Sequence, residues 1–325
     1  MKKGLKIIPG LIISIGLVVY LFIKIDLNAV KQSLFSFHYL TIVLLLSVFL
    51  TGMVSRSFRW QKLISPKEHL TLFFVFKALS IGYMINNILP AKIGELARME
   101  FIKRKKGISR SFLLGTIFVE RLIDLLLVLL IFSVSLVFSR AGRTVFSHNK
   151  CTFIILFLIL FMVVFFLSKP ANFFRLLAFF PNKAKLYIEK FLISFSSSVH
   201  FISNRNLLMQ ISLYSIIIWM LTLLSSYLIL RGLNVYLPFY GYFFVVAVGV
   251  LGLVIPSTSG GIGVFHAIAT GALILLGIPP DKALTYAIIA HAFDFVPNVI
   301  IGLAVFAYEG LTIKNLTITE TQNDH

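Results

Sequence analysis

Charged residues are scarce in this sequence, and acidic residues are the scarcest of them. Only 13% of the 325 residues are charged and only 12 are Asp or Glu, whereas a soluble domain carries about 25% charged residues. Hydrophobic residues make up 58% of the chain. No segment of about ten residues alternates apolar and polar side chains, which argues against a β-barrel. The composition predicts an all-α, polytopic integral membrane protein with no soluble domain.

Cysteine is nearly absent as well. The single cysteine, Cys151, excludes an intramolecular disulfide and a cysteine-cluster metal site. Ser257 and Ser259 lack the sequence context of a catalytic nucleophile, and two histidines with Asp294 are a sparse set for a metal ion. We therefore expect no metal, no cofactor and no enzymatic activity.

Basic residues are abundant, and the formal net charge is +18. In a soluble protein this charge would suggest nucleic acid. Here the Lys and Arg residues gather at the ends of apolar runs, which the positive-inside rule explains without nucleic acid. A basic cytoplasmic rim also attracts anionic lipid headgroups.

We expect six apolar runs to cross the bilayer. The first lacks a small-residue cleavage site, so we expect an uncleaved span rather than a signal peptide. The second ends in Arg59 and Trp60, which read as an interface anchor. We expect one membrane domain over residues 1–310, a cytoplasmic linker at 169–205, and a polar tail from Glu309 that includes 311–325. The six expected crossings are residues 7–25, 40–54, 112–138, 153–167, 207–230 and 283–307.

A broken apolar segment follows the second span. If residues 72–89 crossed the membrane, the seven Lys and Arg residues between 92 and 110 would lie outside. A re-entrant hairpin avoids this: residues 71–87 enter from the cytoplasm, the chain turns near Asn87 to Pro90, and residues 91–102 leave on the same side. This topology places both termini in the cytoplasm, with 21 Lys and Arg inside and 7 outside.

A second break interrupts the apolar residues 239–276, between Pro256 and Gly263. We interpret it as a second re-entrant hairpin, entering from the opposite side. Residues 40–138 and 207–307 then share the order span, hairpin, span, in inverted orientation. Inverted repeats whose broken helices meet near the midplane are typical of transporters, although Pro and Gly are also common in ordinary membrane helices.

Half-helix N-termini at the two breaks would favour a phosphate group, because their free N–H groups point at the ligand. Three basic side chains could add charge-assisted hydrogen bonds. For Arg98, plain positive-inside anchoring is the alternative. The candidate phosphate-binding residues are Lys92, Arg98, Arg121, Gly260, Gly261 and Gly263.

Acidic residues at membrane depth are costly, at about 2.5–3.5 kcal/mol each on insertion scales, and usually pair or line a cavity. Glu95, Glu120 and Asp124 are candidates for a headgroup or proton site, and the alternative is a buried ion-pair network. His266, His291 and Asp294 are candidates for proton coupling, and the alternative is satisfied polar packing. His266 is also a substrate-binding candidate.

Four pieces of this sequence carry a resemblance to a known family: Ser57 to Trp60, Leu89 to Arg98, Glu120 to Asp124, and Pro256 to Phe265. Over nearly the whole chain it resembles the lysylphosphatidylglycerol synthase transmembrane, or flippase-like, family. The resemblance implies a lipid translocase fold with re-entrant helices. Many relatives carry Glu at the position of His266 and Arg at that of Lys92, which leaves headgroup specificity open. Lysyl transfer belongs to a separate soluble domain of such proteins and is not expected here.

These observations together predict a flippase-like translocase that moves a phosphate-bearing lipid or lipid-linked substrate between leaflets of a cell inner membrane. The expected partner is an anionic phospholipid or a polyprenyl-phosphate lipid. The alternative is a membrane-embedded transferase, or an accessory protein, in polyprenyl-phosphate-linked glycan or envelope lipid biosynthesis.

Overall fold

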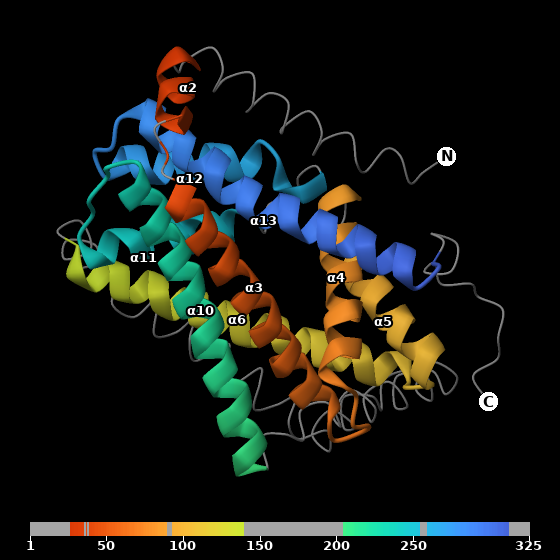
Figure 1. Ribbon diagram of the computed structural model, residues 1–325. Helices are drawn as coiled ribbons and strands as arrows, with labels where there is room; N and C mark the ends of the chain where they lie inside the picture. The colour runs from red at the N-terminus through yellow and green to blue at the C-terminus, as the bar shows by residue number, and fades with distance from the viewer. Residues whose placement is uncertain are drawn as a thin grey trace, which may run out of the picture. The chain divides into compact units, whose positions relative to one another are not determined.

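The computed structural model describes residues 27–35, 37, 39–89, 93–139, 204–253 and 259–311. Over these ranges the chain is helical and forms no strand (Figure 1). The helices are α2 (Leu27–Phe35), α3 (Tyr39–Ile64), α4 (Leu72–Ile88), α5 (Gly94–Lys106), α6 (Arg110–Phe138), α10 (Arg205–Gly232), α11 (Phe239–Gly252), α12 (Val264–Leu275) and α13 (Pro280–Tyr308).

Four of these helices, α3, α6, α10 and α13, are long and apolar enough to cross a membrane, with 25 to 29 residues each. They coincide with four of the predicted crossings; α6, α10 and α13 extend beyond them by a few residues, and α3 continues ten residues past its predicted end to Ile64. The protein is therefore a polytopic membrane protein that is helical over its described residues. The crossings predicted at 7–25 and 153–167, nearly all of the linker 169–205, and the tail beyond Leu311 lie outside the described residues.

The predicted first hairpin corresponds to α4 and α5, which pack side by side (Figure 1). Thr71 caps α4, because its Oγ1 accepts a hydrogen bond from the N–H of Phe74 at 3.3 Å. The helix ends at Ile88, shortly before Pro90, which cannot continue a helix. The helix α5 ends at Lys106 and is capped by Gly107, whose φ of 71° is the left-handed conformation that glycine adopts most easily.

Glycines allow α4 and α5 to approach closely. A Cβ at Gly94 would overlap the carbonyl oxygen of Gly82 and lie 2.7 Å from Oδ1 of Asn86. A Cβ at Gly82 would lie 3.0 Å from the carbonyl oxygen of Gly94. Small residues are the usual means by which membrane helices bring their backbones together. The contact places the first turn of α5 against the middle of α4.

The predicted second hairpin corresponds to α11 and α12, which also pack together. Gly252, at the end of α11, lies so close to Ile268 of α12 that a Cβ there would overlap the isoleucine side chain. Before α12, Gly260, Gly261 and Gly263 have φ values of 66°, 74° and 86°. These left-handed conformations strain any residue with a Cβ, so the glycines are required by the backbone itself.

Two compact units make up the chain, and each draws on both expected halves. Unit 1 comprises residues 1–55, 123–160 and 215–297, and unit 2 comprises 56–122, 161–214 and 298–325. This division differs from the predicted repeat of 40–138 and 207–307, which stays a prediction. The long helices α3, α6, α10 and α13 each contribute residues to both units.

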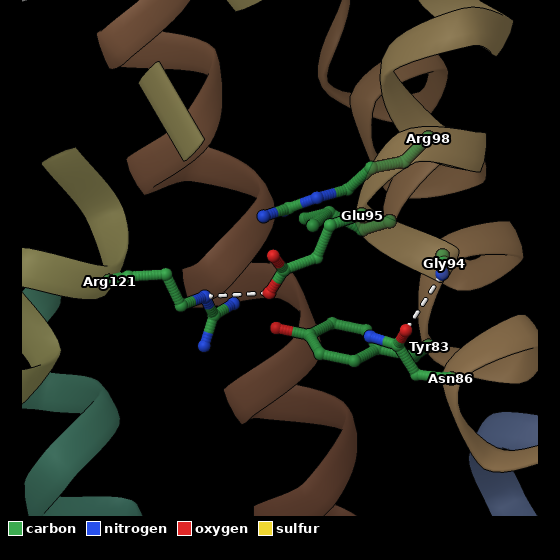
Figure 2. Close-up of a pocket in the computed structure, with 8 residues that line it drawn as sticks. Tyr83, Asn86, Gly94, Glu95, Arg98 and Arg121 are labelled. Carbon is green, nitrogen blue, oxygen red and sulfur yellow. Dashed lines mark hydrogen bonds and ion pairs between the residues drawn. The ribbon is translucent and has the colours of Figure 1, made fainter. Parts of the chain in front are cut away.

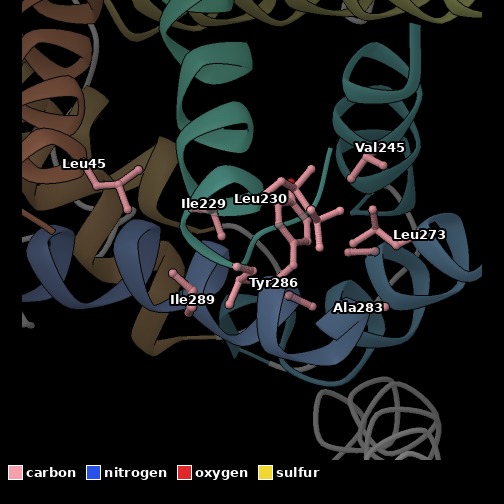
Figure 3. Packing of buried hydrophobic residues seen from close by; sticks show 12 residues of the cluster. Leu45, Ile229, Leu230, Val245, Leu273, Ala283, Tyr286 and Ile289 are labelled. Carbon is pink, nitrogen blue, oxygen red and sulfur yellow. The ribbon is translucent and has the colours of Figure 1, made fainter. Parts of the chain in front are cut away.

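An apolar cluster forms the core of unit 1 (Figure 3). Leu230 of α10, Leu273 of α12 and Ala283 of α13 are fully buried within it. Ser226 and Tyr286 share a hydrogen bond of 2.9 Å between their hydroxyl groups, which satisfies both groups in this buried setting. Apolar contacts therefore hold the second helix pair against α10 and α13.

Two expectations about residues at the ends of apolar segments are wrong. Arg59 and Trp60 are 1% and 0% exposed, so they do not form an interface anchor at the surface. Glu309 is not part of a free tail, because it forms ion pairs with Lys77 and Lys105. In both cases partners from helices distant in sequence override the local pattern.

Candidate functional site

Glu120 of α6 lies at the centre of a buried ionic cluster in unit 2. Its carboxylate is 1% exposed and contacts three guanidinium groups. The distances are 3.5 Å to Nη2 of Arg59, 3.2 Å to Nη1 of Arg98 and 2.9 Å to Nη2 of Arg121. We call Glu120, these three arginines and Glu95 the Glu120 cluster. For Glu120 the sequence left a headgroup or proton site and a buried ion-pair network as alternatives. The structure contains the buried ion-pair network.

Arg98 of α5 is held from two sides. Its guanidinium group lies over the ring of Trp60, 4.4 Å from the ring centroid, and the indole N–H of Trp60 donates to Oγ1 of Thr116 at 3.1 Å. Arg98 is 2% exposed, yet its Nε and Nη2 have no hydrogen-bond partner within the described ranges. A buried donor without a partner is costly, so a hydrogen-bond acceptor beside Nε and Nη2 of Arg98 would be favourable.

A small pocket lies beside this cluster, between α4, α5 and α6 (Figure 2). It holds about 170 Å³ of empty space, including the part open to the outside. Asn86 shapes its wall, because its Oδ1 accepts a hydrogen bond from the N–H of Gly94 at 2.8 Å. We call it the α4–α5 pocket. Its lining residues are Leu79, Gly82, Tyr83, Asn86, Gly94, Glu95, Arg98 and Arg121.

One ion pair borders the pocket in the close-up view (Figure 2). Nε of Arg121 lies 3.1 Å from Oε1 of Glu95, and the two side chains are 45% and 27% exposed. The same guanidinium group also contacts the buried Glu120 through Nη2. Arg121 therefore connects the buried part of the cluster to the accessible part of the pocket.

The structure brings four of the sequence-predicted site residues together: Glu95, Arg98, Glu120 and Arg121. Asp124 follows on α6 but belongs to unit 1, where it is half-buried. Lys92 lies outside the described residues. The predicted residues of the second break, Gly260, Gly261, Gly263 and His266, belong to unit 1.

Sequence reasoning missed Arg59, Tyr83 and Asn86 as site residues. Arg59 was assigned to the interface because it ends an apolar run. A helical pattern could have found the other two: Leu79, Gly82, Tyr83 and Asn86 are spaced i, i+3, i+4 and i+7 and so share one face of α4. Two polar side chains and a glycine on one face of an apolar helix indicate a polar neighbour.

A second polar cluster lies in unit 1, on α12 and α13. The rings of His266 and His291 lie 4.8 Å apart, between centroids, and Phe265 and Phe295 meet His291 edge-on. The N–H of Gly263 donates to Nδ1 of His266 over a long 3.4 Å. Asp294 acts electrostatically on His291 from the next turn of α13. The three proton-coupling candidates thus lie in one neighbourhood.

The basic cluster at the end of α5 is largely paired. Glu100, which is 2% exposed, lies 2.9 Å from Nε of Arg104 and 3.0 Å from Nε of Arg110. Lys106 lies 3.5 Å from Glu68 at the surface. These pairs stabilise the end of α5 as well as contributing positive charge. Within the described ranges, no group of three or more His, Cys, Asp or Glu side chains could hold a metal ion.

Comparisons with known proteins agree with this architecture. The model of the family described as "Lysylphosphatidylglycerol synthase TM region" matches residues 7–302. A UPF0104 membrane protein of Methanocaldococcus jannaschii is 27% identical over 227 residues, which cover 68% of this chain and 92% of that protein. No solved structure matches the chain. With nine helices over its described residues and a family match across most of its length, this chain belongs to the lysylphosphatidylglycerol synthase transmembrane-region family.

Proposed function

We propose that this protein translocates a phosphate-bearing lipid between the leaflets of a cell inner membrane, with both termini in the cytoplasm. The observation that carries the proposal is the buried guanidinium group of Arg98, which lies beside the α4–α5 pocket and whose donor atoms Nε and Nη2 have no partner among the described residues. Phosphate oxygens are the acceptors that a guanidinium group binds best.

The charge of the Glu120 cluster supports an anionic ligand. Arg59, Arg98 and Arg121 contribute three positive charges, and Glu95 and Glu120 contribute two negative ones, which leaves a net charge of +1. Ionisable groups at membrane depth are expensive and usually mark a substrate or ion pathway. A phosphodiester carries one negative charge and would neutralise the cluster.

The size of the α4–α5 pocket supports a headgroup rather than a whole lipid. On the scale used for ligand cavities the pocket offers about 10 Å³, which is room for about one water molecule. A phosphate group would therefore enter only as lining side chains such as Glu95 move aside, and acyl chains would stay outside. The chains would lie in the bilayer, against exposed apolar side chains such as Phe118 of α6 and Phe73 of α4.

The two short helix pairs also support transport. Each pair, α4 with α5 and α11 with α12, has helices of 17 residues or fewer and a glycine at the closest approach of its two members. About 20 residues are needed to cross a bilayer, so we propose that both pairs are re-entrant and related by an inverted repeat. Discontinuous helices in such repeats form the substrate sites of many transporters.

Proton coupling is a further part of the proposal. His266 and His291 lie in contact, and Asp294 is close enough to act on His291. Histidine changes its charge near physiological pH. We propose that these three side chains exchange protons during the transport cycle.

Proteoliposomes test the proposal. The full chain is reconstituted into vesicles that contain a trace of fluorescent phosphatidylglycerol, and a membrane-impermeant reductant measures the fraction of label that reaches the outer leaflet. Wild-type protein should move label, and Arg98→Gln should abolish the movement, because it removes the charged donors at the pocket. Arg231→Gln is the matched control: Arg231 belongs to unit 1, is exposed on α10 and stacks on Tyr236 at 4.4 Å.

Transport by the wild type and the control but not by Arg98→Gln would support the proposal. Equal transport by all three would exclude the Glu120 cluster as the headgroup site. Absence of transport for phosphatidylglycerol and for a short polyprenyl phosphate would contradict translocation. Chemical change of either lipid in detergent, without vesicles, would instead favour the transferase.

A further inference from the structure

Arg121 divides its guanidinium group between two carboxylates that differ sharply in their surroundings. Its Nη2 contacts Glu120, which is 1% exposed and is also held by Arg59 and Arg98. Its Nε contacts Glu95, which is 27% exposed. Within the described ranges, Arg121 is the only ion-pair partner of Glu95. One carboxylate is therefore locked in place and the other can leave.

We propose that Glu95 is a displaceable place-holder, which occupies the anion-binding edge of Arg121 while the α4–α5 pocket is empty and yields that edge to a phosphate group. The inference rests on the proposed function, since it concerns the same site. In this role Glu95 does not attract the headgroup. Its side chain competes with the ligand for Arg121 and so sets how readily the ligand leaves.

The energetics of the exchange favour displacement. We take the exposed side of this ion pair to face a water-filled pocket, where ionisable groups at membrane depth normally lie. In such a pocket a partly exposed ion pair contributes little, because water screens the charges and the side chains lose freedom. A phosphate offers more acceptor atoms than a carboxylate and can accept two parallel hydrogen bonds from one guanidinium group. The exchange replaces one Arg121 contact with a stronger one, and Glu95 moves toward solvent, where its charge is hydrated.

Glu120 cannot take this role. Its carboxylate is buried among three guanidinium groups, and displacing it would leave a buried charge without compensation. It keeps Arg98 and Arg121 oriented toward the pocket throughout. The position of Glu95 in the first turn of α5 adds to the contrast, because that turn packs on Gly82 of α4 and places the Glu95 side chain at the pocket wall (Figure 2).

A competing carboxylate suits a transporter. A site that binds its substrate too tightly releases it slowly, and most changes in affinity appear in the dissociation rate. If Glu95 returns to Arg121 as the headgroup leaves, the site is reset without exposing an unpaired guanidinium group. Loss of this competitor should strengthen binding and slow release.

Binding to the purified full chain in detergent tests the inference. Titration calorimetry would use dihexanoyl phosphatidylglycerol, glycerol 3-phosphate and inorganic phosphate as three separate probes, which distinguishes a lipid headgroup from a free phosphate. Glu95→Gln keeps the shape of the side chain and removes its charge. It should tighten binding of the probe that the wild type prefers by about two- to fivefold, the scale of one partly exposed ion pair.

Glu68→Gln is the matched control, because Glu68 also forms a partly exposed ion pair, with Lys106, and its loss changes the net charge equally. It should leave the affinity unchanged. Arg121→Gln should weaken binding in the wild-type and Glu95→Gln backgrounds alike. In vesicles, Glu95→Gln should reduce turnover while its affinity rises.

The outcomes separate this inference from the proposed function. Binding by Glu95→Gln that is equal to or weaker than that of the wild type, or a gain shared by Glu68→Gln, overturns the place-holder role even if vesicles show transport. Absence of phosphate binding by the wild type overturns it as well. Tighter binding by Glu95→Gln alone, together with an absence of lipid movement in vesicles, supports the place-holder and refutes translocation.

Discussion

The guanidinium group of Arg98 lies 4.4 Å from the ring centroid of Trp60, and both side chains are buried. The contact joins the end of α3 to α5. It orients a cation whose Nη1 donates to Glu120 at 3.2 Å. An interaction between a desolvated guanidinium group and an indole is worth about 2 kcal/mol, so the aromatic ring is part of the site as well as of the core.

Replacement of Trp60 tests this contact. Trp60→Phe removes the hydrogen bond to Thr116 and weakens the stacking on Arg98, and we expect it to lower the free energy of unfolding by about 1–3 kcal/mol. Reversible unfolding in mixed detergent and dodecyl sulfate micelles measures the change. Trp219→Phe is the control, since the indole N–H of buried Trp219 has no hydrogen-bond partner within the described ranges. An equal loss in both variants would contradict a special role for Trp60.

Glu120 should be more important for stability than any exposed carboxylate. Glu120→Ala removes the carboxylate that pairs with the buried guanidinium groups of Arg59 and Arg98, and breaking such a buried pair costs about 3–5 kcal/mol. Glu68→Ala, at a partly exposed pair, should change stability by less than about 1 kcal/mol. The same unfolding assay compares the two variants. Similar losses of stability in both would show that the Glu120 cluster is solvated.

Because α4 and α5 approach closely, we predict that replacing Gly94 by a larger residue destabilises the protein. Gly94→Ala introduces a Cβ that overlaps the carbonyl oxygen of Gly82, and overpacking of this kind costs about 1–3 kcal/mol or more. Thermal unfolding monitored by tryptophan fluorescence measures the effect. Gly271→Ala is the control, because a Cβ there meets no atom of the described residues within 4 Å. Should Gly94→Ala unfold at the wild-type temperature, the backbone contact would be absent in the membrane.

The end of α13 predicts a dependence of stability on pH. The pKa of Glu309 lies below its ordinary value of 4.5, chiefly because Lys77 donates a hydrogen bond to its carboxylate. Burial acts against this shift, and Lys105 adds to it. A carboxylate with a lowered pKa stabilises the folded state above its unfolded-state pKa, and this stabilisation is lost as the pH falls through the lowered value. The wild type should therefore lose stability between about pH 5 and the onset of acid unfolding.

Thermal unfolding of Glu309→Gln across the same pH range checks this origin. The variant should be less stable than the wild type at pH 7 and should approach it as the pH falls, because both then lack the charged carboxylate. A constant difference between the two proteins at all pH values would assign the loss to packing rather than to charge.

The contact between His266 and His291 predicts a response to a pH gradient. Two positively charged rings at 4.8 Å repel one another, so we expect at most one of the two rings to be charged at a time. If the pair exchanges protons during transport, an imposed gradient should change the initial rate of lipid movement in vesicles, and His291→Asn should abolish the response. His69→Asn, at an exposed histidine, is the control. An undiminished response in His291→Asn would exclude coupling through this pair.

Helix positions were predictable because they depend on local sequence. Apolar runs, Pro90 and the glycines before α12 act on their own neighbours, so the predicted segments match α3, α4, α6 and α10 to α13 to within a few residues at most ends. The largest difference at a helix end is on α3, which continues to Ile64. The run was expected to end near residue 54, because hydropathy falls at Arg56 and Arg59. Those residues stay helical because unit 2 buries the face that carries Arg59.

The sequence by itself determined that this chain is a helical membrane protein with polar breaks and buried acids, because composition, apolar length and glycine content are local properties. Only the tertiary structure decided which charges meet. Arg59 and Trp60 come from α3, Arg98 from α5 and Glu120 from α6, and their pairing depends on helices that approach across long stretches of chain. Arg59, which the sequence places at the membrane interface, is buried and is a counter-ion of Glu120. A charge in a dry interior needs a partner, and the sequence does not show which distant residue supplies it.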